Sequence, residues 1–200
     1  MKRQIFRYII VAGTLFLLLV FTYLLYFRGN TAEENTTKQS VAAKNIKQFE
    51  SKHGYSFSYP DFIGGGSQIV DEKLKLSGVE ESVSFQGVSP NRERFAILVS
   101  VEKLSSGSPR DLETLAKTYE DSMGIAGITF VRNLSENKTV NDTAALDRVY
   151  VLSYENLARN SVRFWLKNDT FYVFSVLEGV ASKSSQNIAN GIFNSLQIRN

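Results

Sequence analysis

The residue types that carry most enzyme chemistry are scarce in this chain of 200 residues, which has one histidine and no cysteine. That histidine, His53, stands beside Lys52, and an imidazole needs partner groups to bind a metal or to activate a nucleophile. Because no second His or Cys exists to serve as one, His53 is predicted to be a solvated loop residue. The lack of cysteine also excludes a disulfide scaffold, a Cys-ligated zinc site and the lipid-modified Cys of a lipoprotein.

Glycine, acid and serine patterns with chemical potential fall short of known motifs. Gly64 to Gly66 could hold a phosphate only ahead of a helix, but Ser67 to Val70 follows and has a strand pattern, so a flexible loop is predicted. Three acid pairs lack the spacing of a calcium loop and are predicted to be charged surface: Asp71-Glu72, Glu80-Glu81 and Glu120-Asp121. Since no Gly-x-Ser-x-Gly elbow occurs either, the sequence predicts no enzyme, no metal and no cofactor.

One group of residues could form a binding patch. Arg163 and Trp165 share a face of the strand predicted at 162–167, and with Tyr172 or Tyr154 they would make an aromatic and basic surface. The alternative is that a helix buries this face.

Five asparagines begin an Asn-x-Ser/Thr sequon and are possible glycosylation sites: Asn35, Asn133, Asn137, Asn141 and Asn168. They are used only if the cell glycosylates exported asparagine. The alternative for Asn133 to Asn141 is a polar loop or the edge of a sheet.

Residues 8–27 form an uncharged stretch of 20 residues, YIIVAGTLFLLLVFTYLLYF. As a helix it spans about 30 Å, the thickness of the hydrocarbon layer of a membrane. A cleaved signal peptide and a soluble helix are the alternatives to a retained transmembrane anchor. Lys2, Arg3 and Arg7 outnumber Arg28, so residues 1–7 are predicted to be a short cytoplasmic tail and the rest of the chain to lie outside.

The net charge of +3 comes from this N-terminus. Lys2, Arg3 and Arg7 are the only charged residues before Arg28, and the other 20 basic residues equal the 20 acidic ones in number. A folded part without excess positive charge does not favour nucleic acid as a partner.

Composition divides the exported part in two. Residues 28–48 are polar and are predicted to be a flexible stalk, whereas residues 49–200 have the apolar patterning of one domain. Strands are predicted at 55–59, around Val83 and Phe85, and at 94–102, 149–154, 162–167 and 170–178, with a tight turn at Asn168-Asp169. Apolar spacing predicts a helix after Ser108-Pro109, with Ser108 as its N-cap, and a second helix from about Ser182 to Leu196. The fold class is therefore α+β, with a mainly antiparallel sheet flanked by helices.

The order of these elements resembles the PsbP-like family, named for an extrinsic subunit of photosystem II. The resemblance rests on Gly54 to Pro60, the helix near 111–123, Ile128 to Val131, the meander that ends at Gly179, and Ile192 to Ile198. It implies an α/β/α sandwich for residues 49–200, here as a membrane-anchored member, and a binding or accessory module more often than an enzyme.

The expected function is an extracytoplasmic accessory or binding module, anchored in the bilayer through residues 8–27 and associated with another membrane or envelope protein. The alternative is a solute- or lipid-binding domain with a pocket between sheet and helix, near Tyr119 or Trp165.

Overall fold

The computed structural model describes residues 45–68, 78–125, 128–154, 156–179 and 182–199. Their strands form two sheets, and every strand pair is antiparallel. The small sheet has the order β1-β2-β10, with β1 (Ile46–Ser51), β2 (Tyr55–Pro60) and β10 (Gln197–Ile198). The large sheet has the order β3-β4-β5-β9-β8-β7-β6, with β3 (Ile63–Gln68), β4 (Val79–Val88), β5 (Arg94–Lys103), β6 (Thr129–Val140), β7 (Thr143–Tyr154), β8 (Asn156–Lys167) and β9 (Thr170–Gly179).

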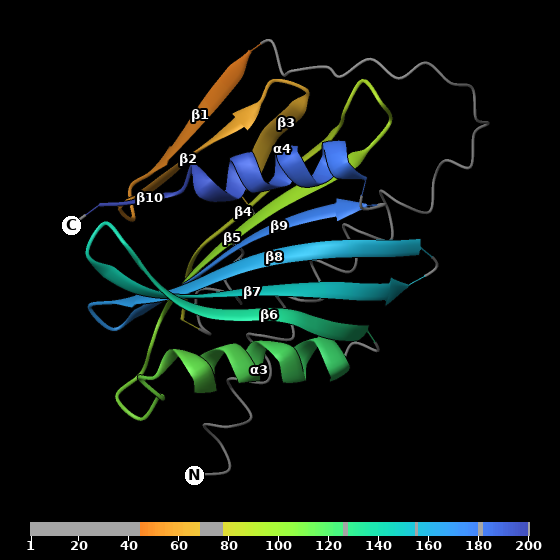
Figure 1. The fold of residues 1–200 in the computed structure, drawn as a ribbon. Coiled ribbons are helices and arrows are strands. Elements are labelled where there is room, and N and C mark those ends of the chain that lie inside the picture. The colour runs from red at the N-terminus through yellow and green to blue at the C-terminus, as the bar shows by residue number, and fades with distance from the viewer. Residues whose placement is uncertain (1–44, 69–77, 126–127, 155, 180–181, 200) are drawn as a thin grey trace.

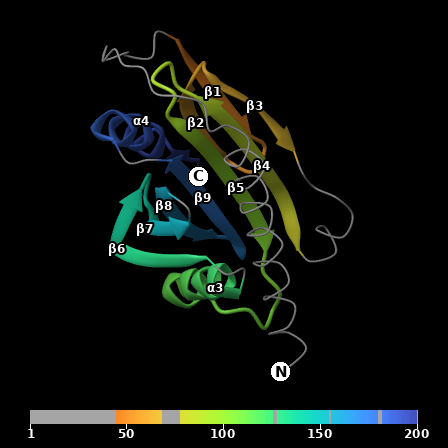
Figure 2. The ribbon, with the colours of Figure 1, turned by 90° about the vertical axis from the view of Figure 1, so that its right-hand side faces the viewer.

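Two helices and the small sheet cover the two faces of the large sheet. Helix α3 (Leu112–Ile125) packs against β7 and β8 on one face. Helix α4 (Lys183–Asn194) packs against β9 and β2 on the opposite face, beside the small sheet (Figure 1). Figure 2, turned by 90°, shows α3 and α4 on opposite sides of the large sheet. The fold is thus an α+β sandwich with a mainly antiparallel sheet, as predicted, although the separate small sheet was not foreseen.

Each face of the large sheet has its own hydrophobic core. Between the large sheet and the layer formed by β2 and α4, the rings of Phe57, Trp165 and Phe174 pack with the apolar side of α4. Under α3, Tyr119 packs against Phe164 and other side chains from β7 to β9. Burial of both faces explains why the centre of β5 is apolar at almost every position, which confirms the prediction of a covered central strand.

Local turn and cap chemistry accounts for several boundaries. Asn168 and Asp169 both have positive φ, as the predicted hairpin turn requires, and Asn141 and Asp142 form a second turn of the same kind. Helix α4 begins after Ser182, whose side chain accepts a hydrogen bond from the backbone N–H of Ser185, so the predicted start is confirmed.

The N-cap predicted for α3 was wrong. The backbone N–H of Thr114 donates to Asp111 Oδ1 at 2.8 Å, so Asp111 caps the helix. Hydrogen bonds from the backbone and the side chain of Thr114 lower the pKa of Asp111, because they stabilise the charged form of its carboxyl group. Ser108 lies in a preceding turn, where its N–H donates to the carbonyl of Ser105.

Other sequence-based boundaries also differ. β1 begins at Ile46, three residues before the predicted start of the domain. Gly64 to Gly66 belong to the strand β3, which has a register irregularity between Gly64 and Ser67, so the predicted flexible loop was wrong. Strands β7 and β8 are 12 residues each, so both begin several residues before the predicted strands of the meander.

The predicted tail, membrane segment and most of the stalk (1–44) lie outside the described residues, as do Lys2, Arg3, Arg7 and Asn35. Within the described ranges, the helices are too short or too polar to span a membrane.

Candidate functional site

A buried polar cluster joins the β1–β2 turn to the start of β4. Ser51 Oγ and the hydroxyl of Tyr55 each donate a hydrogen bond of 2.6 Å to Glu81 Oε2. Glu81 is only 3% exposed, and burial with the adjacent carboxylate raises the pKa of Tyr55 well above its ordinary value. The prediction that Glu80 and Glu81 are both charged surface was therefore wrong for Glu81.

His53 lies at the rim of this cluster. Its Nδ1 is 3.6 Å from Glu80 Oε2, and its backbone carbonyl accepts a hydrogen bond of 3.2 Å from the Tyr172 hydroxyl. The His53 side chain is 17% exposed and its Nε2 is buried with no hydrogen-bond partner among the described residues, so the predicted solvated loop residue is instead partly buried.

The cluster contains a serine, a histidine and two acids, but their connections are not those of a Ser-His-acid triad. Ser51 Oγ donates to Glu81 and accepts from the backbone N–H of His53 at 3.0 Å, while the imidazole faces Glu80. In a triad the imidazole accepts the serine proton, whereas here the hydroxyl of Ser51 bonds to a buried carboxylate oxygen that also accepts from Tyr55. The bonds that are present instead attach the β1–β2 turn to the large sheet. No group of three acids or histidines among the described residues is arranged to hold a metal ion.

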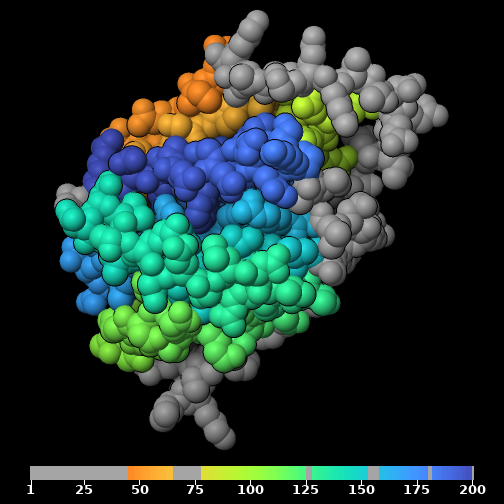
Figure 3. Space-filling model, viewed as in Figure 1, coloured from red at the N-terminus to blue at the C-terminus, as the bar shows by residue number. Residues whose placement is uncertain are grey.

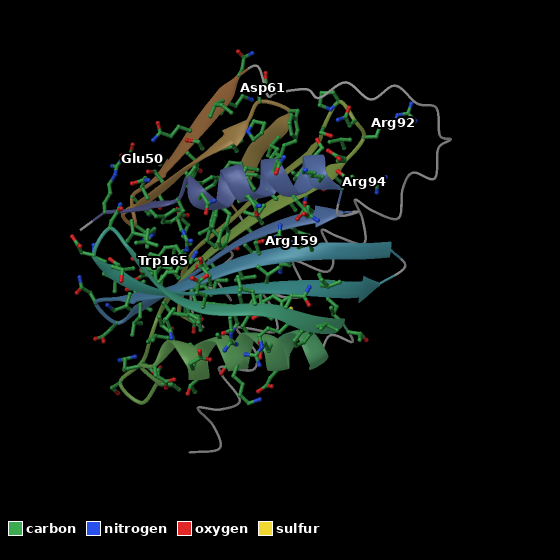
Figure 4. The ribbon with its side chains drawn as sticks, in the orientation of Figure 1. Glu50, Asp61, Arg92, Arg94, Arg159 and Trp165 are labelled. Atoms are coloured by element: carbon green, nitrogen blue, oxygen red, sulfur yellow. The ribbon has the colours of Figure 1, made fainter. Side chains whose placement is uncertain are left out.

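The proposed surface patch of Arg163, Trp165 and Tyr172 was wrong, because all three side chains lie in the core. Trp165 is 0% exposed and stacks on Tyr172, with ring centroids 4.7 Å apart. Arg163 forms a bidentate ion pair with Asp147 and lies over the ring of Phe193 in α4. Figure 4 shows Trp165 inside the molecule, where the two sheets meet. Tyr154 lies beyond the side chains that the structure describes.

The expected pocket receives no support from the two regions named for it. Tyr119 packs against Phe164 and Tyr150, and Trp165 packs against Tyr172 and Tyr55. Aromatic side chains of the protein itself thus fill the space next to both rings.

Charged side chains fasten both helices to the large sheet. Arg148, which is almost completely buried on β7, pairs with Glu113 and Glu120 of α3. Glu120 is 12% exposed, so only Asp121 of that predicted surface pair lies in solvent. Under α4, Arg159 donates to the buried Glu178 at 2.8 Å and to Asn190, and it lies between β8 and α4 (Figure 4). The pair Asp71-Glu72 lies outside the described residues.

Four of the sequon asparagines lie on exposed backbone. Asn133 and Asn137 are on β6, which confirms the sheet-edge alternative for this region. Asn168 is in the β8–β9 turn. The side-chain amide of Asn141 donates to Gln197 and to the carbonyl of Ile198, so it is already engaged.

The edge strand β6 is a long, exposed feature of the described structure. Every residue from Val131 to Thr139 is exposed, including the apolar Val131 (59%) and Leu134 (43%). In Figure 3 the strands β6 and β7, in teal, cross the visible face below α4, in blue. A long edge strand presents unpaired backbone donors and acceptors that can bind another strand. The polar residues of this region indicated a loop or a sheet edge, but not the length of the strand or its exposed apolar residues.

Glu102 on β5 has an unusual protonation behaviour. Glu102 is partly buried and lies opposite Phe171 in the register of β5 and β9. Burial raises the pKa of its carboxyl group to about 7. Because this pKa is above that of the unfolded chain, the folded protein binds a proton here between about pH 4.5 and 7 that the unfolded chain has lost. Because of Glu102, the free energy of unfolding should therefore fall as pH rises through this window.

Glu102→Gln is expected to raise the free energy of unfolding by about 1–3 kcal/mol at pH 8 and to change it little at pH 4. Urea unfolding at a series of pH values measures this difference. Asp121→Asn, at an exposed site on α3, is the control and should shift stability by less than about 0.5 kcal/mol. An equal effect of Glu102→Gln at both pH values would contradict the prediction.

Comparisons with known proteins identify the fold. No protein-family model matches the sequence, and no curated protein matches it as a relative. Among solved structures, cyanobacterial PsbP (CyanoP) from Synechocystis is similar with a TM-score of 0.54 and 15% identity, covering 82% of this chain and 98% of CyanoP. The Ran-binding protein Mog1p from Saccharomyces cerevisiae is similar with a TM-score of 0.52 and 12% identity, covering 77% of this chain and 95% of Mog1p.

These similarities support a PsbP-like fold, as the resemblance in the sequence implied. At such low identity they establish the architecture alone, and function has to be argued from the chain's own residues.

Proposed function

We propose that the chain is a single-pass membrane protein whose PsbP-like domain acts outside the cytoplasm as an accessory module that binds another protein. The observation that carries the binding role is the exposed edge of β6 with Val131 and Leu134. A structural neighbour described as Ran-binding supports the idea that a domain of this fold can present a protein-binding surface. Another membrane or envelope protein is the expected partner.

The membrane part of the proposal depends on the sequence. Residues 8–27 carry no charge and are long enough to cross the bilayer. Lys2, Arg3 and Arg7 on one side against Arg28 on the other favour a cytoplasmic N-terminus. The domain from 49 to 200 would then be held outside by the stalk at 28–48.

Fractionation and protease protection test this topology. The intact chain is expected to remain with membranes after alkaline extraction, and protease added from outside should digest the domain in intact cells or spheroplasts. The variant K2E/R3E/R7E removes the positive bias and should reduce the accessible fraction, whereas R28Q should leave it unchanged or increase it. A domain that is protected from external protease while the membrane is sealed would overturn the topology.

A separate experiment tests binding. Photo-crosslinking from a reactive residue placed at Val131 should capture a membrane or envelope protein, and the same group at Lys117 on α3 is the matched control. Equal capture of the same proteins from both positions would mean that β6 is not the binding surface.

A further inference from the structure

We infer that the edge of β6 pairs two copies of this chain, in an antiparallel arrangement centred on Asn137. This inference goes beyond the proposed function, because it concerns self-association. A second copy paired at Leu134 to Val140 and a partner protein bound to the same segment would exclude each other. It rests on the register, exposure and charge of one segment, Leu134 to Val140.

One side of β6 is available for pairing. The strand is the last of the large sheet and pairs with β7 alone among the described strands (Figure 2). The irregularity between Arg132 and Leu134 interrupts the strand near its start, and bulges of this kind protect sheet edges from unwanted pairing. From Leu134 to Val140 the register is regular, so seven residues offer an uninterrupted edge.

The side chains of this segment alternate between the two faces of the sheet. Leu134, Glu136, Lys138 and Val140 share the face on which α4 lies, because their partners on β7 belong to the face that includes the buried Ala145. Ser135, Asn137 and Thr139 lie on the opposite face. When two antiparallel copies of β6 are related by a two-fold axis at Asn137, every side chain lies opposite a side chain on the same face of the sheet.

The same arrangement is complementary in charge and polarity. In this arrangement Glu136 of each copy lies opposite Lys138 of the other, which gives two contacts between opposite charges. Leu134 of each copy lies opposite Val140 of the other, on the same face of the sheet. Glu136 and Lys138 already pair within the strand, with Lys138 Nζ 3.3 Å from Glu136 Oε2, and their side chains are 51% and 41% exposed, so both can also reach across the edge. A centre on Glu136 or on Lys138 would instead place two like charges directly opposite each other, which is unfavourable. The charge pattern therefore selects Asn137 as the centre.

A contact of seven residues is small, so the pairing should be weak for dilute chains and stronger when copies are concentrated, as in one membrane. Because the chain has no cysteine, a single introduced cysteine gives an unambiguous crosslink. The experiment uses the intact chain in detergent micelles or lipid vesicles, with oxidant or a short bis-maleimide.

N137C is expected to form a crosslinked dimer at least about fivefold faster than K117C, because directly opposed residues in a strand pair have Cβ atoms about 5 Å apart. Lys117 is 72% exposed on α3, outside the segment proposed to pair, and reports random collision. Crosslinking of N137C no faster than K117C would overturn the inference.

Charge reversal tests the register. In the N137C background, E136K and K138E each create two like-charge contacts and are expected to lower the crosslinking rate about tenfold. When the two proteins are mixed, both lysines on the edge of the E136K chain face acidic residues of the K138E chain, and heterodimers should form at the parental rate. Circular dichroism of each variant confirms folding, and E136K alone suffices if K138E, whose new carboxylate would lie near Asp147, is unstable. Unchanged homodimer formation by E136K, or no recovery in a mixture of two folded variants, would overturn the Asn137-centred pairing.

Discussion

Arg163→Met is expected to lower the free energy of unfolding by about 3–5 kcal/mol, because it leaves the buried carboxylate of Asp147 without its main partner. Arg163 donates from Nε and from a terminal nitrogen to the two oxygens of Asp147 at 2.6 and 2.7 Å. Both side chains are 5% exposed or less, so water cannot replace the lost bonds. Lys138 Nζ, 3.9 Å from Asp147, offers only partial compensation.

A double variant separates the cost of an unpaired charge from the value of the pair. D147L/R163M removes both charges and is expected to lose less stability than R163M alone, since an apolar pair needs no hydrogen-bond partners. Arg110→Met breaks an exposed pair with Asp169 and should cost at most about 1 kcal/mol.

Urea unfolding, followed by the fluorescence of the single tryptophan, measures all three variants. An unchanged midpoint for R163M would show that Arg163 does not have the structural role described above. A role for Arg163 in surface binding would require normal stability together with a loss of partner capture.

Features fixed by neighbouring residues were predictable from the sequence. The turn at Asn168-Asp169 depends on two residues that tolerate positive φ, and the start of α4 depends on Ser182 and the apolar spacing that follows. The N-cap of α3 was ambiguous because Ser108 and Asp111 both suit that position. Local preferences could not decide between them, and in the structure Asp111 bonds to the helix.

Features that depend on distant segments were not predictable. Alternation correctly placed Arg163 and Trp165 on the same face of β8, and the alternative of burial under a helix is confirmed, but the sequence did not show which helix covers this face or that β2 shares in the cover. The cover comes from β2 and from α4, which the sequence does not assign to either side of the sheet. In the same way, the burial of Glu81 depends on Ser51 and Tyr55, about 30 residues earlier, and on a register irregularity between Val79 and Glu81.

The largest single side-chain deletion in this core is Trp165→Ala, for which we expect a loss of about 3–5 kcal/mol. Trp165 lies opposite the small Ala145 on β7 and opposite Tyr172 on β9, so its ring fills the space that Ala145 leaves. It stacks on Tyr172 and meets the edge of Tyr55 from the small sheet at a centroid distance of 6.3 Å. Removal of the ring therefore weakens the contact between the two sheets as well as leaving a cavity.

Circular dichroism measures the unfolding of W165A, which has no tryptophan, and W165F is the matched control that keeps an aromatic ring and should lose less. In the wild-type chain, burial of Trp165 at 0% exposure predicts blue-shifted emission that iodide quenches poorly until the protein unfolds. Emission and quenching typical of a solvated indole in the folded protein, together with an unchanged midpoint for W165A, would contradict this position for Trp165 and would restore it as a candidate for surface binding. Blue-shifted emission with a destabilised W165A would assign the ring to joining the two sheets, and leave partner binding to the edge of β6.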